Sequence, residues 1–167
     1  MNYFWLDASA VVKRYITEVG TANMQYFFTH VRPDRMIICR PITVGEVISI
    51  FVRRKNSQQI TAVYFNQIKQ LFQNEIRRHP DILKILPTEI QEDASVEFIE
   101  AYSINSTDAL ILQCAIDKTI KLQMNGNNLV LVSSDKRLLR AAQSEELLTF
   151  NPETDNQAAL DVLIDPP

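Results

Sequence analysis

The sequence predicts an α/β protein of three layers, with helices on both faces of a central, mainly parallel sheet of about five strands. Short apolar runs typical of buried strands alternate along the chain with longer segments of helical spacing. The run Leu-Val-Leu-Val at 129–132 is continuously apolar, which is typical of a central parallel strand. The intervening helical segments are the connections that parallel strands require.

Each predicted strand is a short apolar segment bounded by polar residues or proline, at residues 3–6, 35–39, 82–86, 129–132 and 147–150. Apolar spacings of three and four predict helices over 9–16, 20–31, 42–55, 58–78, 88–103, 106–122 and 135–144. Pro41 suits the first turn of the third helix. Thr88 and Gln91 match a capping box.

Composition indicates one folded domain. The chain has 167 residues, 46% hydrophobic and 22% charged, and is long enough for a sizeable core without disulfides. We expect this domain to span 1–150, followed by an acidic tail at 151–167 that is poorly ordered, since it lacks Lys and Arg and contains prolines. The net charge of −3 argues against a general DNA-coating protein. It does not exclude a nuclease, because metal-binding acids lower the charge.

The two cysteines indicate a reducing compartment. Cys39 and Cys114 are far apart in the sequence, with no CxxC pattern and no His at ligand spacing, so we expect reduced, buried thiols. No apolar run approaches the ~20 residues of a membrane span. The first residues lead directly into a strand, without a signal-peptide pattern. These features predict a cytoplasmic protein that does not bind membranes.

Two acids lie just after predicted strands. Asp7 ends the first strand, and Asp135 follows the strand 129–132 after two serines. Either carboxylate can simply cap the next helix, a contribution of ~1 kcal/mol. The carboxyl ends of parallel strands are also where open α/β sheets bind ligands. Both interpretations remain open for each acid taken alone.

Two further acids lie on predicted helices. Glu46 belongs to a narrow stripe of small and polar residues on a mostly apolar helix, and Arg53 on that stripe could pair with it. Asp108 lies in the first turn of a very apolar helix, where an acid complements the helix dipole by ~0.3–1 kcal/mol. Ser106 and Thr107 could cap that helix without it.

Taken together, the four acids favour a metal site. Asp7, Asp108 and Asp135 are expected near one edge of the sheet, and Glu46 can reach that edge from the helix after the second strand. Carboxylates gathered at one place repel one another, and they take up protons or recruit a cation. An oxygen-only set of ligands suits Mg²⁺ or Mn²⁺. Such an ion can activate water against a phosphodiester.

The sequence resembles the PIN-domain family, in particular the VapC-like ribonuclease toxins, over about residues 1–150. Four family motifs occur in order, each on the expected element, at 6–9 (Leu-Asp-Ala-Ser), 43–47 (Thr-Val-Gly-Glu-Val), 107–111 (Thr-Asp-Ala-Leu-Ile) and 133–135 (Ser-Ser-Asp). Ser133 stands where Thr is more usual, and the chain is longer than typical VapC toxins. The helix 58–78 and the tail account for the extra length.

The resemblance implies an Mg²⁺- or Mn²⁺-dependent endoribonuclease that cuts single-stranded regions of structured RNA and leaves 3′-hydroxyl and 5′-phosphate ends. Asp7, Glu46, Asp108 and Asp135 would be the catalytic acids that hold the metal, one of them orienting the attacking water. Ser9 and Ser133 would support them by hydrogen bonds. The resemblance also implies a homodimer that is inhibited by a small antitoxin protein, as the toxin of a type II toxin–antitoxin pair.

Five cations are expected to flank the acids and to contact RNA phosphates, namely Lys13, Arg14, Lys136, Arg137 and Arg140. One alternative function is a non-catalytic PIN-like module that binds RNA or a protein. A phosphoacceptor receiver domain would need a second acid beside Asp7, a central acceptor Asp and a Lys after the last strand. The third strand instead ends at Leu86-Pro87 and the last at Asn151-Pro152, which argues against that class.

Overall fold

The computed structural model describes residues 1–166 and contains one five-stranded sheet of order β3-β2-β1-β4-β5. Every pair of neighbouring strands is parallel. This confirms the predicted fold class. The strands are β1 (Asn2–Leu6), β2 (Met36–Cys39), β3 (Leu83–Ile85), β4 (Asn128–Val132) and β5 (Leu148–Phe150).

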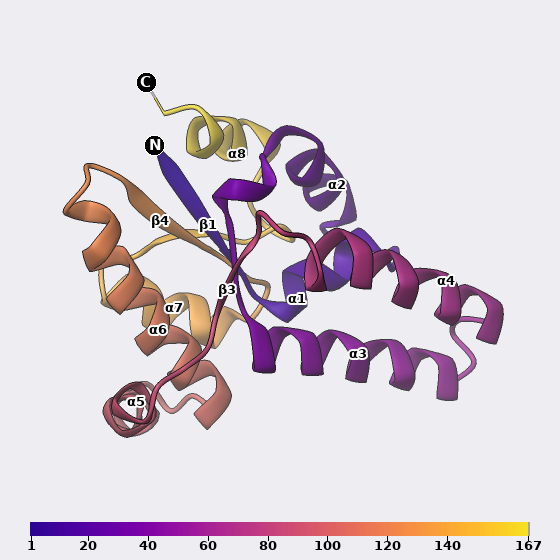
Figure 1. Ribbon diagram of the computed structural model, residues 1–167, viewed down its shortest axis with the longest axis horizontal. Coiled ribbons are helices and arrows are strands. Elements are labelled where there is room, and N and C mark those ends of the chain that lie inside the picture. The colour runs from indigo at the N-terminus through magenta and orange to yellow at the C-terminus, as the bar shows by residue number, and fades with distance from the viewer. Residues whose placement is uncertain (167) are drawn as a thin grey trace.

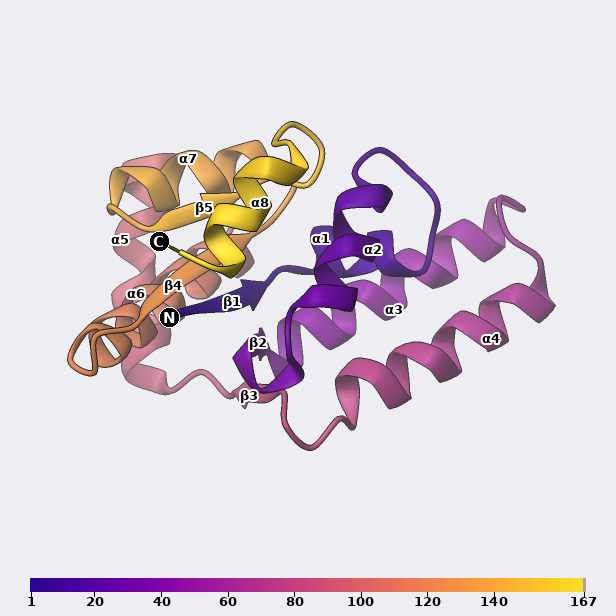
Figure 2. The ribbon, with the colours of Figure 1, turned by 90° about the horizontal axis from the view of Figure 1, so that it is seen from above.

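Helices cover both faces of the sheet (Figures 1 and 2). They are α1 (Ala8–Val11), α2 (Thr21–His30), α3 (Arg40–Asn56), α4 (Ala62–Phe72), α5 (Glu89–Tyr102), α6 (Ser106–Gln123), α7 (Lys136–Ser144) and α8 (Gln157–Ile164). The core on one face includes side chains of α1, α2, α3, α4 and α8, and the core on the other includes those of α6 and α7, with α5 packed against them. Within residues 1–166, no helix has the length and apolar character needed to cross a membrane.

β1 contributes to both cores because side chains alternate along a strand. Phe4 and Leu6 belong to the core beneath α1 and α2, and Trp5 belongs to the core beneath α6 and α7. All three side chains are fully buried. As the central strand, β1 pairs with β2 on one side and β4 on the other. Residues that follow β1, β2 and β4 are therefore delivered to one edge of the sheet.

The α3–α4 hairpin differs from the prediction at its turn. Helix α4 begins at Ala62 rather than Gln58, because Gln58 has a φ of 60° and Thr61 caps α4 by accepting a hydrogen bond from the amide of Tyr64. After α4 the helical path continues as a π-helical turn over Gln73–Arg77. The two helices lie side by side and extend beyond the sheet (Figures 1 and 2).

The C-terminal segment contains a helix where the sequence predicts poor order. Helix α8 begins after Asn156, whose side chain accepts from the amide of Ala159. Leu160 and Ile164, four residues apart on one face, are buried in the core beside α2. The reason for the difference is packing, because α2 offers an apolar surface that the tail sequence alone does not reveal.

The tail also packs closely on the loop before α2. Gly20 has a φ of +86°, and a Cβ atom at this position would lie 2.7 Å from the carbonyl oxygen of Pro152. The Asn23 side chain donates to the carbonyls of Pro152 and Asp155, at 2.9 and 2.8 Å. Residues 152–155 are therefore fixed beside the loop that follows α1.

Candidate active site

Asp7 is held by one of its two carboxylate oxygens. It caps α1, and its Oδ2 accepts from the amide and the hydroxyl of Ser9, at 3.2 and 2.6 Å, and from the Ser133 hydroxyl at 3.0 Å. The side chain is only 5% exposed. Its Oδ1 makes no hydrogen bond with any residue of 1–166. Asp7 can therefore cap the helix and still present one oxygen to a ligand.

Ser9, in α1, and Ser133, which follows β4, connect these two segments by hydrogen bonds. Their hydroxyl oxygens lie 3.2 Å apart, and both donate to Asp7. The Ser9 hydroxyl accepts from the amide of Ser134 at 2.8 Å, and the Ser133 hydroxyl accepts from the amide of Asp135 at 3.0 Å. These bonds fix the loop that carries Asp135 relative to Asp7.

Asp135 repeats the arrangement at the start of α7. Its Oδ1 accepts from the amides of Arg137 and Leu138, at 2.7 and 3.2 Å, and so caps the helix. Its Oδ2 has no hydrogen-bond partner in the described part of the chain. The carboxylate is half-buried.

Asp108, in the first turn of α6, is anchored by Asn105. The Asn105 amide nitrogen donates to Asp108 Oδ2 at 2.7 Å, and the amide of Asp108 donates back to the Asn105 side-chain oxygen at 2.8 Å. The helix cap is thus Asn105, rather than Ser106 or Thr107. Burial, followed by the nearby Asp135 and Asp7, raises the pKa of Asp108 to about 6.

Glu46, in the second turn of α3, has no anchor. Its half-buried carboxylate forms no hydrogen bond or ion pair with any residue of 1–166, so the expected alternative of a salt bridge with Arg53 is absent. Burial, followed by the charges of Asp7 and Asp108, raises the pKa of Glu46 to about 7, and Arg53 opposes this shift. Glu46 therefore lies close enough to Asp7 and Asp108 for their charges to raise its pKa.

The four acids lie close enough for their charges to interact, but they are not arranged to bind one metal ion together. Among residues 1–166, no three His, Cys, Asp or Glu side chains are placed closely enough to hold one metal ion. The chemistry of the set nevertheless fits a hard divalent cation, since all its donors are oxygens and each Asp has one unbonded oxygen. Asp7, Glu46 and Asp108 also repel one another, and a cation would relieve this repulsion.

The cations predicted to contact RNA divide into two groups. Lys13 is only 2% exposed, with its ammonium 2.8 Å from Glu18 and 2.7 Å from Glu153. Arg14 pairs with Glu75 at 3.3 Å and donates to Gln25. Both are thus engaged within the protein. The cations on α7 are instead exposed, namely Lys136, Arg137 and Arg140.

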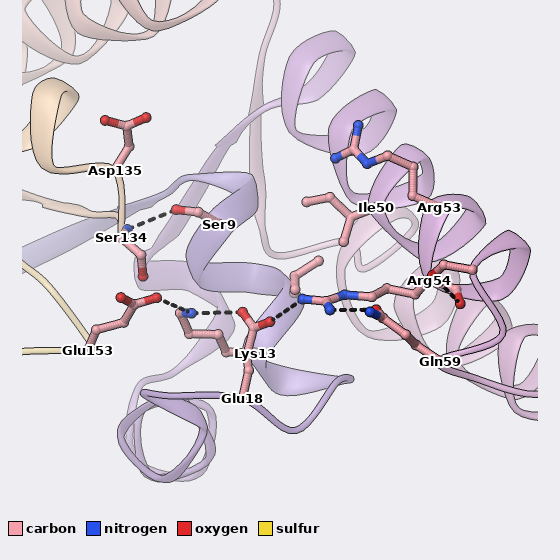
Figure 3. A pocket seen from close by; sticks show the side chains of 12 residues that line it. Ser9, Lys13, Glu18, Ile50, Arg53, Arg54, Gln59, Ser134, Asp135 and Glu153 are labelled. Carbon is pink, nitrogen blue, oxygen red and sulfur yellow. Dashed lines mark hydrogen bonds and ion pairs between the residues drawn. The ribbon is translucent and has the colours of Figure 1, made fainter.

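A cavity of about 570 Å³ adjoins the acids, with Ser9, Ser134 and Asp135 in its wall and Arg53 and Arg54 of α3 among its other lining residues (Figure 3). Neither this cavity nor the role of Asn105 was predicted from the sequence. The signal for Asn105 was present, because an Asn three residues before Asp108 has the spacing of a cap.

The chain belongs to the PIN domain family, whose model matches residues 15–153. The match includes Glu46, Asp108 and Asp135, and it begins after Asp7. A search of curated proteins finds no significant match. PIN domains are typically nucleases that use divalent metal ions, and this membership supports a nuclease role for the chain.

Proposed function

We propose that this chain is a divalent-metal-dependent endoribonuclease. The observation that carries the proposal is the shared design of its aspartates. Asp7, Asp108 and Asp135 each anchor one carboxylate oxygen within the protein and leave the other unbonded, at the edge of the sheet that Glu46 also approaches. Helix capping does not account for two of these acids, because the cap of α6 is Asn105 rather than Asp108 and Glu46 lies within α3.

The four carboxylates would hold Mg²⁺ or Mn²⁺, directly or through water, after small side-chain movements. When bound, such an ion activates water and neutralises charge on a phosphodiester. Ser9 and Ser133 keep Asp7 and the Asp135 loop in place by the hydrogen bonds described above. One of the four acids would orient the attacking water and accept its proton.

In the proposed hydrolysis, the water oxygen bonds to phosphorus as the bond from phosphorus to the ribose O3′ breaks. The water proton passes to a carboxylate, and the departing O3′ takes up a proton. The products are therefore a 3′-hydroxyl and a 5′-phosphate end. The exposed cations of α7 would contact RNA phosphates on one side of this site.

A cleavage assay on single-stranded RNA tests this proposal. We expect the wild type to cleave with Mg²⁺ or Mn²⁺ and to stop when EDTA is added. Asp7→Asn and Asp108→Asn should lose about 100-fold or more of the rate, the scale of losing one charge-stabilising group. Added Mn²⁺ alone should also raise the melting temperature of the wild type more than that of either variant.

Asp117→Asn is the matched control, because Asp117 lies on the same helix as Asp108 and, within residues 1–166, its carboxylate bonds only to Gln91 and Gln113. It should keep wild-type activity. Cleavage that persists in EDTA, or equal rates in the two active-site variants and the wild type, would contradict the proposal. RNA binding without cleavage under any divalent ion would favour the alternative of a non-catalytic PIN module.

We further propose that the chain is the toxin of a type II toxin–antitoxin pair, a cytoplasmic homodimer inhibited by a small antitoxin protein. The support is the resemblance of its four motifs to VapC-like toxins. Expression of the wild type should arrest bacterial growth, while Asp7→Asn should not. A small antitoxin gene beside this one would support the assignment, and growth unaffected by the wild type would count against it.

A further inference from the structure

The cavity beside the acids has the size and character of a ligand site. Its volume of about 570 Å³ lies within the roughly 300–1,000 Å³ of small-ligand pockets. It shares Ser9 and Asp135 with the candidate active site, so an occupant would lie directly next to the catalytic acids. Val12 and Ile50 give it an apolar surface, and none of its lining residues is aromatic.

Two of the three cations in the cavity wall are already neutralised. The buried Lys13 contacts Glu18 and Glu153, and the other oxygen of Glu18 accepts from Arg54 at 3.0 Å. Arg54 also donates to Gln59 at 2.6 Å. Figure 3 shows this continuous chain of charges, which joins the C-terminal segment, the loop after α1, and α3.

The third cation, Arg53, is free. It is exposed, and its guanidinium forms no hydrogen bond or ion pair with any residue of 1–166. It lies two helical turns beyond Glu46 on the same face of α3, and it lines a different part of the cavity wall from Asp135 (Figure 3). A phosphate that enters the cavity would therefore meet one unpaired cation.

We propose that Arg53 binds a backbone phosphate of single-stranded RNA next to the scissile phosphate, with the adjoining nucleotide in this cavity. The inference rests on the proposed nuclease function and names a substrate-binding residue for it. A guanidinium binds phosphate with two parallel hydrogen bonds. It would offset the repulsion between RNA and the four acids. Because the cavity lacks an aromatic surface for base stacking, the nucleotide should be held mainly through its phosphate.

Binding of a fluorescent single-stranded RNA tests this role in an Asp7→Asn background, which prevents cleavage. Adding Arg53→Ala should weaken binding about tenfold, the scale of one lost charge-assisted hydrogen bond. The slope of log affinity against log salt should fall by about 0.7, as expected for one phosphate on a single strand. Arg53→Lys should recover part of the affinity.

Arg78→Ala is the matched control, since Arg78 is also exposed and unpaired in the described chain but does not line the cavity. It should change affinity less than twofold. In cleavage by the otherwise wild-type enzyme, Arg53→Ala should raise KM about tenfold and change kcat less than threefold. Melting curves should show that each variant is folded.

The inference is overturned if Arg53→Ala binds RNA as well as its parent, if Arg78→Ala loses as much affinity, or if the parent binds no single-stranded RNA. Failure of the nuclease proposal has a different signature. In that case the wild type would bind RNA and cleave none, while Arg53→Ala still reduced binding.

Discussion

At the residue scale, the two capping aspartates each keep one carboxylate oxygen available for a ligand. In Asp7 and in Asp135 the oxygen that caps the helix is distinct from the one left unbonded. The capping bonds limit the rotation of each carboxylate and so orient the free oxygen. Supporting hydrogen bonds of this kind fix the groups that hold a metal or a substrate.

The neighbouring serines provide a test of this support. Ser133 is fully buried and bonds to Asp7 and to the amide of Asp135, so Ser133→Ala should lower the free energy of unfolding by about 1–3 kcal/mol. The hydroxyl of Ser134 is buried without a partner in the described chain, and Ser134→Ala should change stability by no more than about 0.5 kcal/mol or raise it. Urea unfolding measures both, and equal losses would refute this account.

At the scale of elements, α8 is part of the domain. It packs against α2 and contributes two buried side chains to the core that also contains β1 and α1. With the close contact between Gly20 and Pro152, the C-terminal segment closes one face of the sheet. Glu153, just before α8, also partners the buried Lys13 in the wall of the cavity. The tail thus connects the core with the surroundings of the site.

Helix α8 offers a matched pair of substitutions. Leu160 is fully buried, so Leu160→Ala should lower the free energy of unfolding by about 2–5 kcal/mol. Val162 on the same helix is 58% exposed, so Val162→Ala should change it by less than about 0.5 kcal/mol. Chemical denaturation compares the two. A Leu160→Ala variant as stable as the wild type would mean that α8 does not hold the core in solution.

Apolar periodicity predicted the five strands, their order along the chain and seven of the eight helices, because the pattern records which face of each element is buried. It missed α8, since a segment of eight residues carries little periodicity and its burial depends on α2. The four acids were likewise identifiable by position. Which oxygen each Asp uses, and the burial of Lys13 between two carboxylates, depend on side-chain packing that a linear pattern does not contain.

At the scale of the whole molecule, charge is unevenly distributed about the acids. The chain carries a net charge of −3, yet Arg53 lies on one flank of the site and the exposed cations of α7 on another. The unrelieved repulsion is among Glu46, Asp7 and Asp108. Stability should therefore depend on pH and on divalent ions.

In EDTA, the free energy of unfolding should fall as pH rises from about 4 to about 7. The folded-state pKa values of Glu46 and Asp108, about 7 and about 6, exceed the ordinary values near 4 that apply in the unfolded chain. In this window the folded protein binds more protons than the unfolded one, and each proton lost from these acids on raising the pH weakens folding.

Thermal melting between pH 5 and 7.5 measures this effect. The Glu46→Gln, Asp108→Asn double variant should show a smaller fall in melting temperature than the wild type, because its two side chains do not titrate. Saturating Mg²⁺ at pH 7.5 should raise the melting temperature of the wild type but not that of the double variant. Identical slopes in both proteins would show that these acids are not the cause.

The central position of β1 also has a consequence for synthesis of the chain. Asp7 depends on Ser133, which follows it by 126 residues, and β1 must pair with β4 before the two meet. A ribosome adds about 5–20 residues per second, so roughly 6–25 s separate the emergence of the two residues. Throughout that interval the nascent chain exposes an unpaired edge of β1. The nascent polypeptide therefore cannot assemble the site until β4 has been translated.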